Sequence, residues 1–367
     1  MLLERDTIQK GKEWNMHLVI GGAYQGKKEY VKKKYSIEES DIWQDGYPVA
    51  EGQWRCINGL HKFISGVMEK LMNDDSEEQK ARNDAQRIEN YVNQITGYLL
   101  NMAVQMPDLI LVCDEVGNGI VPMEKAERDY RECVGRVLCV LAGEADTVER
   151  VHCGIPQKIK ESVYISLIRH GSTEGNLQKR YIGTTDEPLC REGREALESW
   201  KADGIYPQAA RVIVSPMRRC LETAEILYPD VTPEIYPEFR ETDFGLLEGK
   251  SYEELMQDST LKPVYQKWLD SNGTMAFPQG ESMEQMKSRC AEGFEKLVPT
   301  LSSDTAMVVH GGTIMSLLQM YATPQRDYYD YQCANGAGYL CRVELTGDKK
   351  LYQMKVVREI PGEKQAR

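Results

Sequence analysis

Three short segments of this chain, at residues 164–168, 211–214 and 306–309, are almost continuously apolar. Runs of this kind are typical of parallel strands that helices cover on both faces, because such strands have no solvated side. Between these runs the apolar spacing changes to a helical period, so strands and helices alternate along the chain. We therefore expect an α/β fold with two three-layer α/β/α domains, at residues 1–160 and 161–367.

The N-terminal half shows the same alternation. A short apolar strand at residues 16–20 leads into a tight turn at Gly21 and Gly22. Further strands are predicted at 109–113 and 147–153, and helices at 77–106 and 125–144. A helical spacing is also shown by Ile57, Leu60, Ile64, Val67, Met68 and Leu71.

Composition excludes several classes of partner. The 367 residues carry 57 acidic and 45 basic side chains, a net charge of -12. This balance argues against nucleic acid or an anionic membrane as a partner, since both need a basic face. No apolar run approaches the roughly 18–20 residues that span a bilayer, and the N-terminus does not resemble a secretory signal. The ten cysteines show no metal-binding spacing. We therefore expect a reduced, cytoplasmic protein without structural zinc, and its oligomeric state stays open.

Each of the three apolar segments ends in residues that suit a phosphate group. The first leads into Arg-His-Gly-Ser-Thr-Glu-Gly-Asn at 169–176, and the third into His-Gly-Gly-Thr at 310–313. The second leads into Ser215 and a predicted helix that begins with Arg218 and Arg219. Ligands of open α/β sheets bind beyond the carboxyl ends of the strands, where helix N-termini favour anions. These three clusters are therefore expected to form one anion site.

The residue types at this site suit phosphoryl transfer without a metal. A neutral imidazole can attack phosphorus and form a covalent phosphohistidine, which divides hydrolysis into two easier steps. A guanidinium group can bind two phosphate oxygens at once, and a carboxylic acid can protonate the leaving oxygen. We therefore expect a phosphatase with no cofactor and no metal.

These segments, together with Arg-Glu-Thr-Asp-Phe-Gly at 240–245, resemble the signature of the histidine phosphatase (phosphoglycerate mutase-like) superfamily over residues 164–345. The resemblance implies that His170 is the nucleophile and Glu241 the proton donor. It also implies that the phosphate pocket consists of Arg169, Arg219 and His310, with support from Thr173, Asn176 and Gly311. Arg219 is preferred to Arg218 because the family places its arginine four residues after the serine. Glu248-Gly249 and the lack of room for mutase inserts favour a phosphatase over a mutase.

A second phosphate-binding pattern lies near the N-terminus. Gly21, Gly22, Gly26, Lys27 and Lys28 follow the strand at 16–20 in the order of a P-loop. The full pattern ends in a hydroxyl residue that holds Mg²⁺, and Lys28 occupies that place here. Asp114 and Glu115, after the strand at 109–113, resemble the acidic strand end that faces such a loop. ATP or GTP could bind there, whereas the lysines at 32–34 are expected on a solvated helix face.

Residues 114–122, 128–131, 135–137 and 153–160 resemble the adenosylcobinamide kinase / adenosylcobinamide-phosphate guanylyltransferase family, with similarity over 16–160. The chain departs from that family at Lys28 and at Leu138-Cys139. No histidine lies between His17 and His61, where the family carries a guanylylated one, and His61 itself is expected to be structural. The resemblance thus implies a degenerate P-loop-like domain that binds a nucleotide or a corrinoid.

Together the two resemblances imply one pathway. One branch of the histidine phosphatases is similar to α-ribazole-5′-phosphate phosphatase, which acts in assembly of the cobalamin nucleotide loop. The adenosylcobinamide kinase / guanylyltransferase family acts in the same assembly. We expect α-ribazole-5′-phosphate to be the substrate. Two alternatives stay open: a bifunctional enzyme with a working adenosylcobinamide kinase domain, and a phosphatase for another small ester with a non-catalytic N-terminal module.

Overall fold

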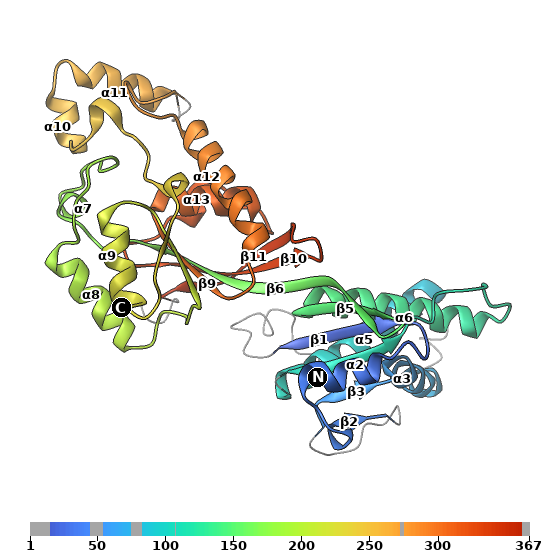
Figure 1. Cartoon of the computed structure of the whole chain (residues 1–367). Coiled ribbons are helices and arrows are strands. Elements are labelled where there is room, and N and C mark those ends of the chain that lie inside the picture. The colour runs from blue at the N-terminus through green and yellow to red at the C-terminus, as the bar shows by residue number, and fades with distance from the viewer. Residues whose placement is uncertain (1–14, 45–53, 75–82, 107, 272–274, 362–367) are drawn as a thin grey trace. The chain divides into compact units, whose positions relative to one another are not determined.

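The computed structural model describes residues 15–44, 54–74, 83–106, 108–271 and 275–361. The chain divides into two compact units, Met1–Ser162 and Val163–Arg367 (Figure 1). In the described part of the chain, no helix is long and apolar enough to cross a membrane.

The first unit contains a mostly parallel sheet with the strand order β2-β3-β4-β1-β5-β6. Its strands are β1 (Met16–Gly21), β2 (Ile42–Trp43), β3 (Cys56–Asn58), β4 (Leu109–Asp114), β5 (Thr147–His152) and the first part of β6 (Ile155–Arg169). Among the strand pairings described in this unit, that of β5 with β6 is antiparallel and the others are parallel. Its helices are α2 (Lys27–Tyr35), η1 (Glu39–Asp41), α3 (Leu60–Asp74), α5 (Asp84–Gln105) and α6 (Lys125–Glu144).

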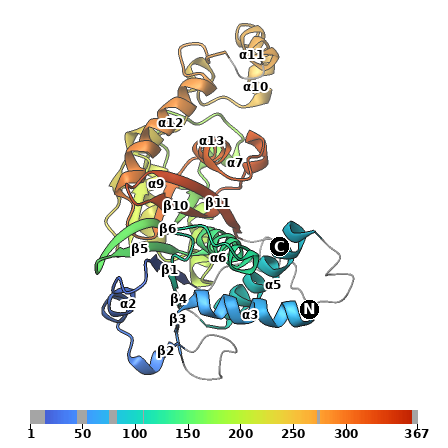
Figure 2. The same cartoon turned by 90° about the vertical axis from the view of Figure 1, so that its right-hand side faces the viewer.

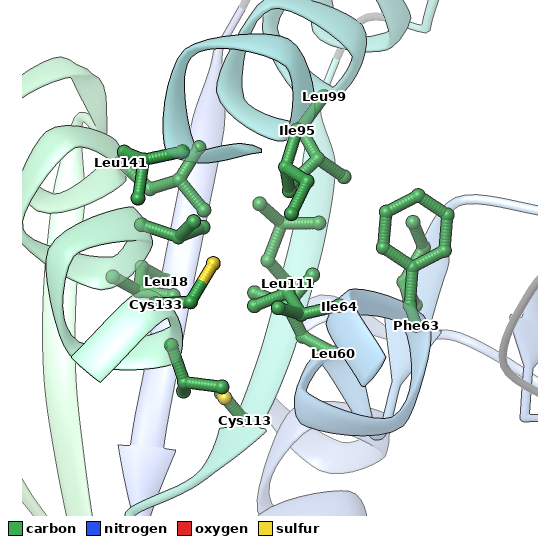
Figure 3. Packing of buried hydrophobic residues seen from close by; sticks show 14 of the residues in the cluster. Leu18, Leu60, Phe63, Ile64, Ile95, Leu99, Leu111, Cys113, Cys133 and Leu141 are labelled. Carbon is green, nitrogen blue, oxygen red and sulfur yellow. The ribbon is translucent and has the colours of Figure 1, made fainter. Parts of the chain in front are cut away.

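Helices cover both faces of this sheet. Leu18 and Leu111, paired on β1 and β4, pack in one apolar cluster with residues of α3, α5 and α6 (Figure 3). Val19 and Val112, the next residues on the same two strands, pack on the opposite face with Val31 of α2. Successive strand residues point to opposite faces, so a strand that is apolar at every position needs both layers.

Two predicted elements of this unit differ from the structure. Ile57, expected in a helix, lies in strand β3, where it pairs with Leu111. Gly59, with φ +89°, separates this strand from α3, which begins one residue later. A three-residue buried strand is too short for its period to be recognised, so its spacing merged with that of the helix. The helix expected at 77–106 begins at Asp84 in the structure, and residues 77–82 lie outside the described residues.

The second unit contains the parallel strands β6-β9-β7-β8, with β10 paired to the other edge of β6 and antiparallel to β11. The additional strands are β7 (Arg211–Val214), β8 (Glu234–Ile235), β9 (Thr305–Val309), β10 (Gly338–Thr346) and β11 (Leu351–Ile360). The helices are α7 (Glu174–Leu177), α8 (Arg191–Ala202), α9 (Arg218–Leu227), η2 (Pro237–Phe239), η3 (Gly245–Leu247), α10 (Tyr252–Gln257), α11 (Leu261–Asp270), α12 (Met283–Leu297), η4 (Val298–Thr300), α13 (Gly311–Tyr321) and η5 (Tyr328–Tyr331).

The three apolar segments are adjacent parallel strands in this sheet. Leu167 of β6 and Met307 of β9 pack with α12 and α13 on one face, and Ile168 and Val308 pack with α8 and α9 on the other. Figure 1 shows these helices and strands. The predicted α/β class with helices on both faces is therefore confirmed. The carboxyl ends of β6, β9 and β7 lie at the same edge of the sheet, which places the residues that follow them together.

Helices α10 and α11 form a separate part of the second unit. In both views they lie away from the strands, beyond one end of α12 (Figures 1 and 2). They have an apolar cluster of their own, with Leu255 and Tyr265 packed against Phe277.

Candidate active site

His170 follows the last residue of β6 and is held in one orientation. Its backbone N–H donates to Val309 O of β9 (3.0 Å), and its Nδ1 lies 2.8 Å from Gly171 O. A carbonyl oxygen only accepts, so Nδ1 carries the proton and Nε2 keeps a free lone pair. Burial, together with the charges of Arg219 and Arg169, holds the pKa of His170 well below its ordinary value. The imidazole is therefore neutral near pH 7 and can act as a nucleophile through Nε2.

The two adjacent arginines of α9 have different environments. The guanidinium of Arg219, a residue that is 1% exposed, donates to Thr185 O (2.9 Å) and Gly183 O (3.0 Å). Arg218 has a 58% exposed side chain and pairs with Glu222 one turn along the helix (2.8 Å). The structure thus brings Arg219, and not Arg218, into the charge environment of His170.

Arg169 and Arg219 each keep an unused donor. Arg169, the last residue of β6, donates from Nη1 to Cys333 O (2.8 Å). Its buried Nε, and that of Arg219, have no hydrogen-bond partner among the described residues. A buried N–H without a partner is costly, and an anion with several acceptor oxygens would remove that cost. A side chain at Gly311 would lie 3.5 Å from Arg169 Nε, so the start of α13 adjoins this donor.

His310 lies between the end of β9 and the start of α13 and is fully buried. Its ring centroid is 5.1 Å from that of His170, and its Nε2 lies 2.7 Å from Ser215 Oγ at the end of β7. Burial and the charge of Arg219 hold the pKa of His310 well below its ordinary value. The Ser215 hydroxyl can donate to this Nε2, and a neutral His310 that accepts there carries its proton on Nδ1, which can then act as a donor.

Glu241 lies beside that donor. Its Oε2 is 3.7 Å from His310 Nδ1, and its Oε1 accepts from the backbone N–H of Thr242 (2.9 Å). The side chain is 14% exposed, and burial raises the pKa of Glu241 above its ordinary value. A raised pKa favours the protonated carboxyl group, which is the form that can donate a proton.

Thr173 and Asn176 bond to each other in a capping box at the start of α7. Thr173 Oγ1 accepts from Asn176 N (3.3 Å), and Asn176 Oδ1 accepts from Thr173 N (3.2 Å). Asn176 Oδ1 also accepts from Asn335 Nδ2 (3.0 Å). Neither Asn335 nor the contact between Ser215 and His310 was predicted. Asn335 lies in a loop without a motif, far from residues 169–176 in the sequence, so only the pairing of β10 with β6 brings it here.

The N-terminal pattern forms a loop between β1 and α2. Gly26, at the N-cap of α2, has φ +82°, and a side chain at Gly21 would lie 2.3 Å from Val151 O. Lys27 is 5% exposed, and its ammonium contacts Gly22 O (2.6 Å) and Asp114 Oδ1 (2.7 Å). The predicted loop residues therefore lie together with Asp114.

Other predicted residues of this loop are engaged elsewhere. Lys28, in the place of the hydroxyl residue, pairs with Glu39, and Glu115 pairs with Arg150 (3.0 Å). A cation in the place of a Mg²⁺ ligand does not fit a metal-bound nucleotide.

His61 and Lys34 have contacts that the sequence pattern did not predict. His61, at the start of α3, accepts from the backbone N–H of Asp114 at Nδ1 (3.3 Å), so it adjoins the loop. Lys34, expected on a solvated face, pairs with the buried Glu149 (2.6 Å).

Comparison with protein families gives two matches. Residues 165–356 match the histidine phosphatase superfamily (branch 1). Residues 57–159 match the family of cobinamide kinase / cobinamide phosphate guanyltransferase. The second match begins after the loop at residues 21–28, so the similarity to that family lies outside this loop.

Known proteins resemble the C-terminal half. The "Probable phosphoglycerate mutase GpmB" of Proteus mirabilis is 29% identical over 161 residues, 42% of this chain and 72% of the relative. The "Uncharacterized phosphatase PhoE" of Bacillus subtilis is 30% identical over 161 residues, 42% of this chain and 75% of the relative. A crystal structure of the α-ribazole phosphatase from Shigella flexneri matches with a TM-score of 0.45 and 21% identity, over 53% of this chain and 94% of that one.

Proposed function

This chain belongs to the histidine phosphatase superfamily (branch 1), and from that premise we propose that it hydrolyses a phosphate monoester through a phosphohistidine at His170. One observation carries this proposal. His170 is neutral with Nε2 free, beside two guanidinium groups whose buried Nε–H donors have no partner among the described residues. This combination of a nucleophile and unused anion donors suits a phosphoryl group.

The proposed reaction has two steps. In the first, Nε2 of His170 attacks phosphorus, the bond to the ester oxygen breaks, and Glu241 gives its proton to that oxygen. In the second, Glu241 takes a proton from a water molecule that attacks the phosphohistidine, and inorganic phosphate leaves. Arg169, Arg219 and the Nδ1 donor of His310 stabilise the charge on the phosphoryl oxygens in both steps.

The substrate that we propose is α-ribazole-5′-phosphate. The support is the fusion of this phosphatase unit to a unit that matches the cobinamide kinase / cobinamide phosphate guanyltransferase family. Both units would then serve nucleotide-loop assembly, the second as the phosphatase and the first as a binding unit. The relatives named as phosphoglycerate mutases make phosphoglycerate the necessary comparison substrate.

The proposal is tested by phosphate release from α-ribazole-5′-phosphate, 3-phosphoglycerate and common sugar and nucleotide monophosphates. We expect α-ribazole-5′-phosphate to have the highest kcat/KM by orders of magnitude. His170→Ala should remove essentially all hydrolysis, because no covalent intermediate can form, and EDTA should leave activity unchanged. Substantial turnover by the folded His170→Ala variant would contradict the nucleophile. A preference for another ester would contradict only the pathway.

For the first unit we propose binding of a nucleotide or a corrinoid without phosphoryl transfer. The support is Lys28, whose ammonium pairs with Glu39 where a kinase of this type needs a hydroxyl on Mg²⁺. The alternative, a working adenosylcobinamide kinase, is favoured by the contact of Lys27 with Asp114, which retains the lysine and the acidic strand end of the loop.

A further inference from the structure

The loop at residues 333–337 closes against the end of β6. Its backbone binds both residues of the Arg-His pair: Gly336 N lies 3.0 Å from Arg169 O and 3.1 Å from His170 O, and Cys333 O accepts from Arg169. The loop leads directly into β10, which pairs with β6. A side chain at Gly338 would lie 1.8 Å from Leu167 O, so this close approach needs glycine. The backbone of the loop is therefore fixed beside the nucleophile.

Asn335 lies in this loop, and its side chain donates to two acceptors outside the loop. Its Nδ2 donates to His170 O (3.2 Å) and to Asn176 Oδ1 (3.0 Å). Because a carbonyl oxygen only accepts, the atom of Asn335 between these two oxygens is the amino nitrogen. A carboxylate oxygen in that place would face two acceptors at hydrogen-bond distance.

The amide of Asn176 is thereby fixed in one of its two orientations. Its Oδ1 accepts from Asn335 Nδ2 and from the backbone N–H of Thr173 (3.2 Å), and two donors occupy the two lone pairs of that oxygen. The hydrogen-bonding group that remains on this side chain is the Nδ2 amino group, which only donates. A phosphoryl group, whose exposed atoms are acceptors, needs a donor of this kind.

We propose that Asn335 is a positioning residue of the phosphatase site, which holds the Asn176 amide so that its amino group serves as a donor to the phosphoryl oxygens. The inference rests on the proposed phosphatase function and adds to it a residue outside the family motifs. Asn335 acts through Asn176, and it need not touch the substrate.

The test uses the full-length protein with p-nitrophenyl phosphate as substrate and inorganic phosphate as competitive inhibitor. Asn335→Asp keeps the shape of the side chain and replaces the donor by an acceptor. We expect it to weaken phosphate inhibition by about 10- to 100-fold, the usual range for hydrogen bonds to a charged group. Asn335→Ala, which leaves the Thr173 donor in place, should have a smaller effect. Gln332→Ala, at an exposed amide just before the loop, is the control and should stay within about twofold of the wild type.

A double-mutant cycle with Asn176→Ala decides the mechanism. If Asn335 acts through Asn176, then Asn335→Ala should change the inhibition constant for phosphate by less than about twofold in the Asn176→Ala background. Effects that multiply independently would overturn the inference, as would unchanged phosphate inhibition in folded Asn335→Ala. The alanine cycle decides the question even if Asn335→Asp fails to fold. A wild type that does not hydrolyse p-nitrophenyl phosphate would instead contradict the proposed function.

Discussion

At the residue scale, the proposed chemistry depends on which of two neighbouring arginines is buried. Arg219 is held by backbone carbonyls at residues 183 and 185, whereas Arg218 lies in solvent and pairs with Glu222. The two side chains have the same charge and are adjacent in the sequence. Their different surroundings give a matched pair of substitutions.

Arg219→Lys should lower kcat/KM for p-nitrophenyl phosphate by about 100- to 1,000-fold, the usual cost of losing one donor to a developing charge. A lysine cannot reproduce the planar fork that reaches two carbonyls and still presents Nε–H. Arg218→Lys should change kcat/KM by no more than about fivefold, because an exposed ion pair contributes up to about 1 kcal/mol. Steady-state kinetics on both variants, with their thermal unfolding, checks this prediction. Equal losses would mean that both arginines serve the site.

The pH dependence of an alkyl phosphate ester should show two limbs. His170 acts only when unprotonated, and burial together with the charge of Arg219 places its pKa well below 6.5, so the acid limb should lie well below pH 6.5. Glu241 acts when protonated, and burial raises its pKa above 4.5, so activity should fall as the pH rises through this raised pKa. Measurement of kcat/KM against pH checks both limbs. An acid limb at or above pH 6.5 would contradict the neutral nucleophile.

Glu241→Gln should slow hydrolysis strongly for alkyl esters and little for p-nitrophenyl phosphate. The alkoxide is a poor leaving group and needs the proton, whereas p-nitrophenolate leaves without it. Single-turnover rates for the two esters, measured on the same preparation, make the comparison. Equal slowing for both would count against Glu241 as the acid.

At the scale of elements, the segment at residues 182–185 connects two parts of the site. Its carbonyls hold Arg219, and the backbone N–H groups of Gly183 and Thr185 donate to Glu248 Oε1 (2.8 and 2.9 Å). A side chain at Gly183 would lie 2.0 Å from Thr242 O, so the segment approaches the residue after Glu241 directly. A small displacement of this segment would therefore shift the positions of both Arg219 and Glu241.

Gly183→Ala should destabilise the protein by about 1–3 kcal/mol, as overpacking does, and should lower kcat/KM at the same time. The control is Gly143→Ala in helix α6, where the added methyl group meets nothing within 4 Å. That change should be neutral or stabilise by up to about 1 kcal/mol, because alanine is the better helix former. Thermal unfolding and steady-state kinetics check both variants. A Gly183→Ala variant with wild-type activity would show that this segment does not position Arg219.

At the scale of the whole molecule, each unit has its own hydrophobic core. The clusters of the first unit pack on β1 and β4, and those of the second pack on β6, β9 and β7. Each unit therefore packs around a core of its own. A substitution in the loop at residues 21–28 of the first unit should leave the phosphatase activity unchanged.

Lys27→Ala should weaken ATP or GTP binding while phosphatase kcat/KM stays within about twofold of the wild type, as expected for residues of two units that each have their own core. Lys33→Ala, at an exposed position on helix α2, is the control and should change neither nucleotide binding nor phosphatase kcat/KM. Calorimetric titration with and without Mg²⁺ checks the binding. We expect Mg²⁺ not to raise the nucleotide affinity, because Lys28 stands in the place of the hydroxyl residue that would hold the metal. Affinity that depends on Mg²⁺, together with phosphorylation of adenosylcobinamide, would support the bifunctional alternative instead.

Much of the phosphatase site is predictable because its determinants are local. His170, Ser215 and His310 each follow a strand that is recognisable from its apolar run, and parallel strands carry their carboxyl ends to one edge. The α/β class follows from the same runs, since strands without a polar side need helices on both faces. The sequence by itself therefore determined the class of fold, the order of the motifs and the family.

Tertiary structure alone decided which side chains meet and in which protonation state. The hydrogen bond from Asn335 to Asn176 and the contact between Ser215 and His310 join segments that are far apart in the chain. The buried Nε–H donors of Arg169 and Arg219, which have no partner among the described residues, also come from separate segments. Short elements such as β3 likewise gain their identity from the strand beside them. The physical reason is that hydrogen bonding, burial and pKa depend on surroundings that the packed sheet and loops create, and a local pattern contains no record of them.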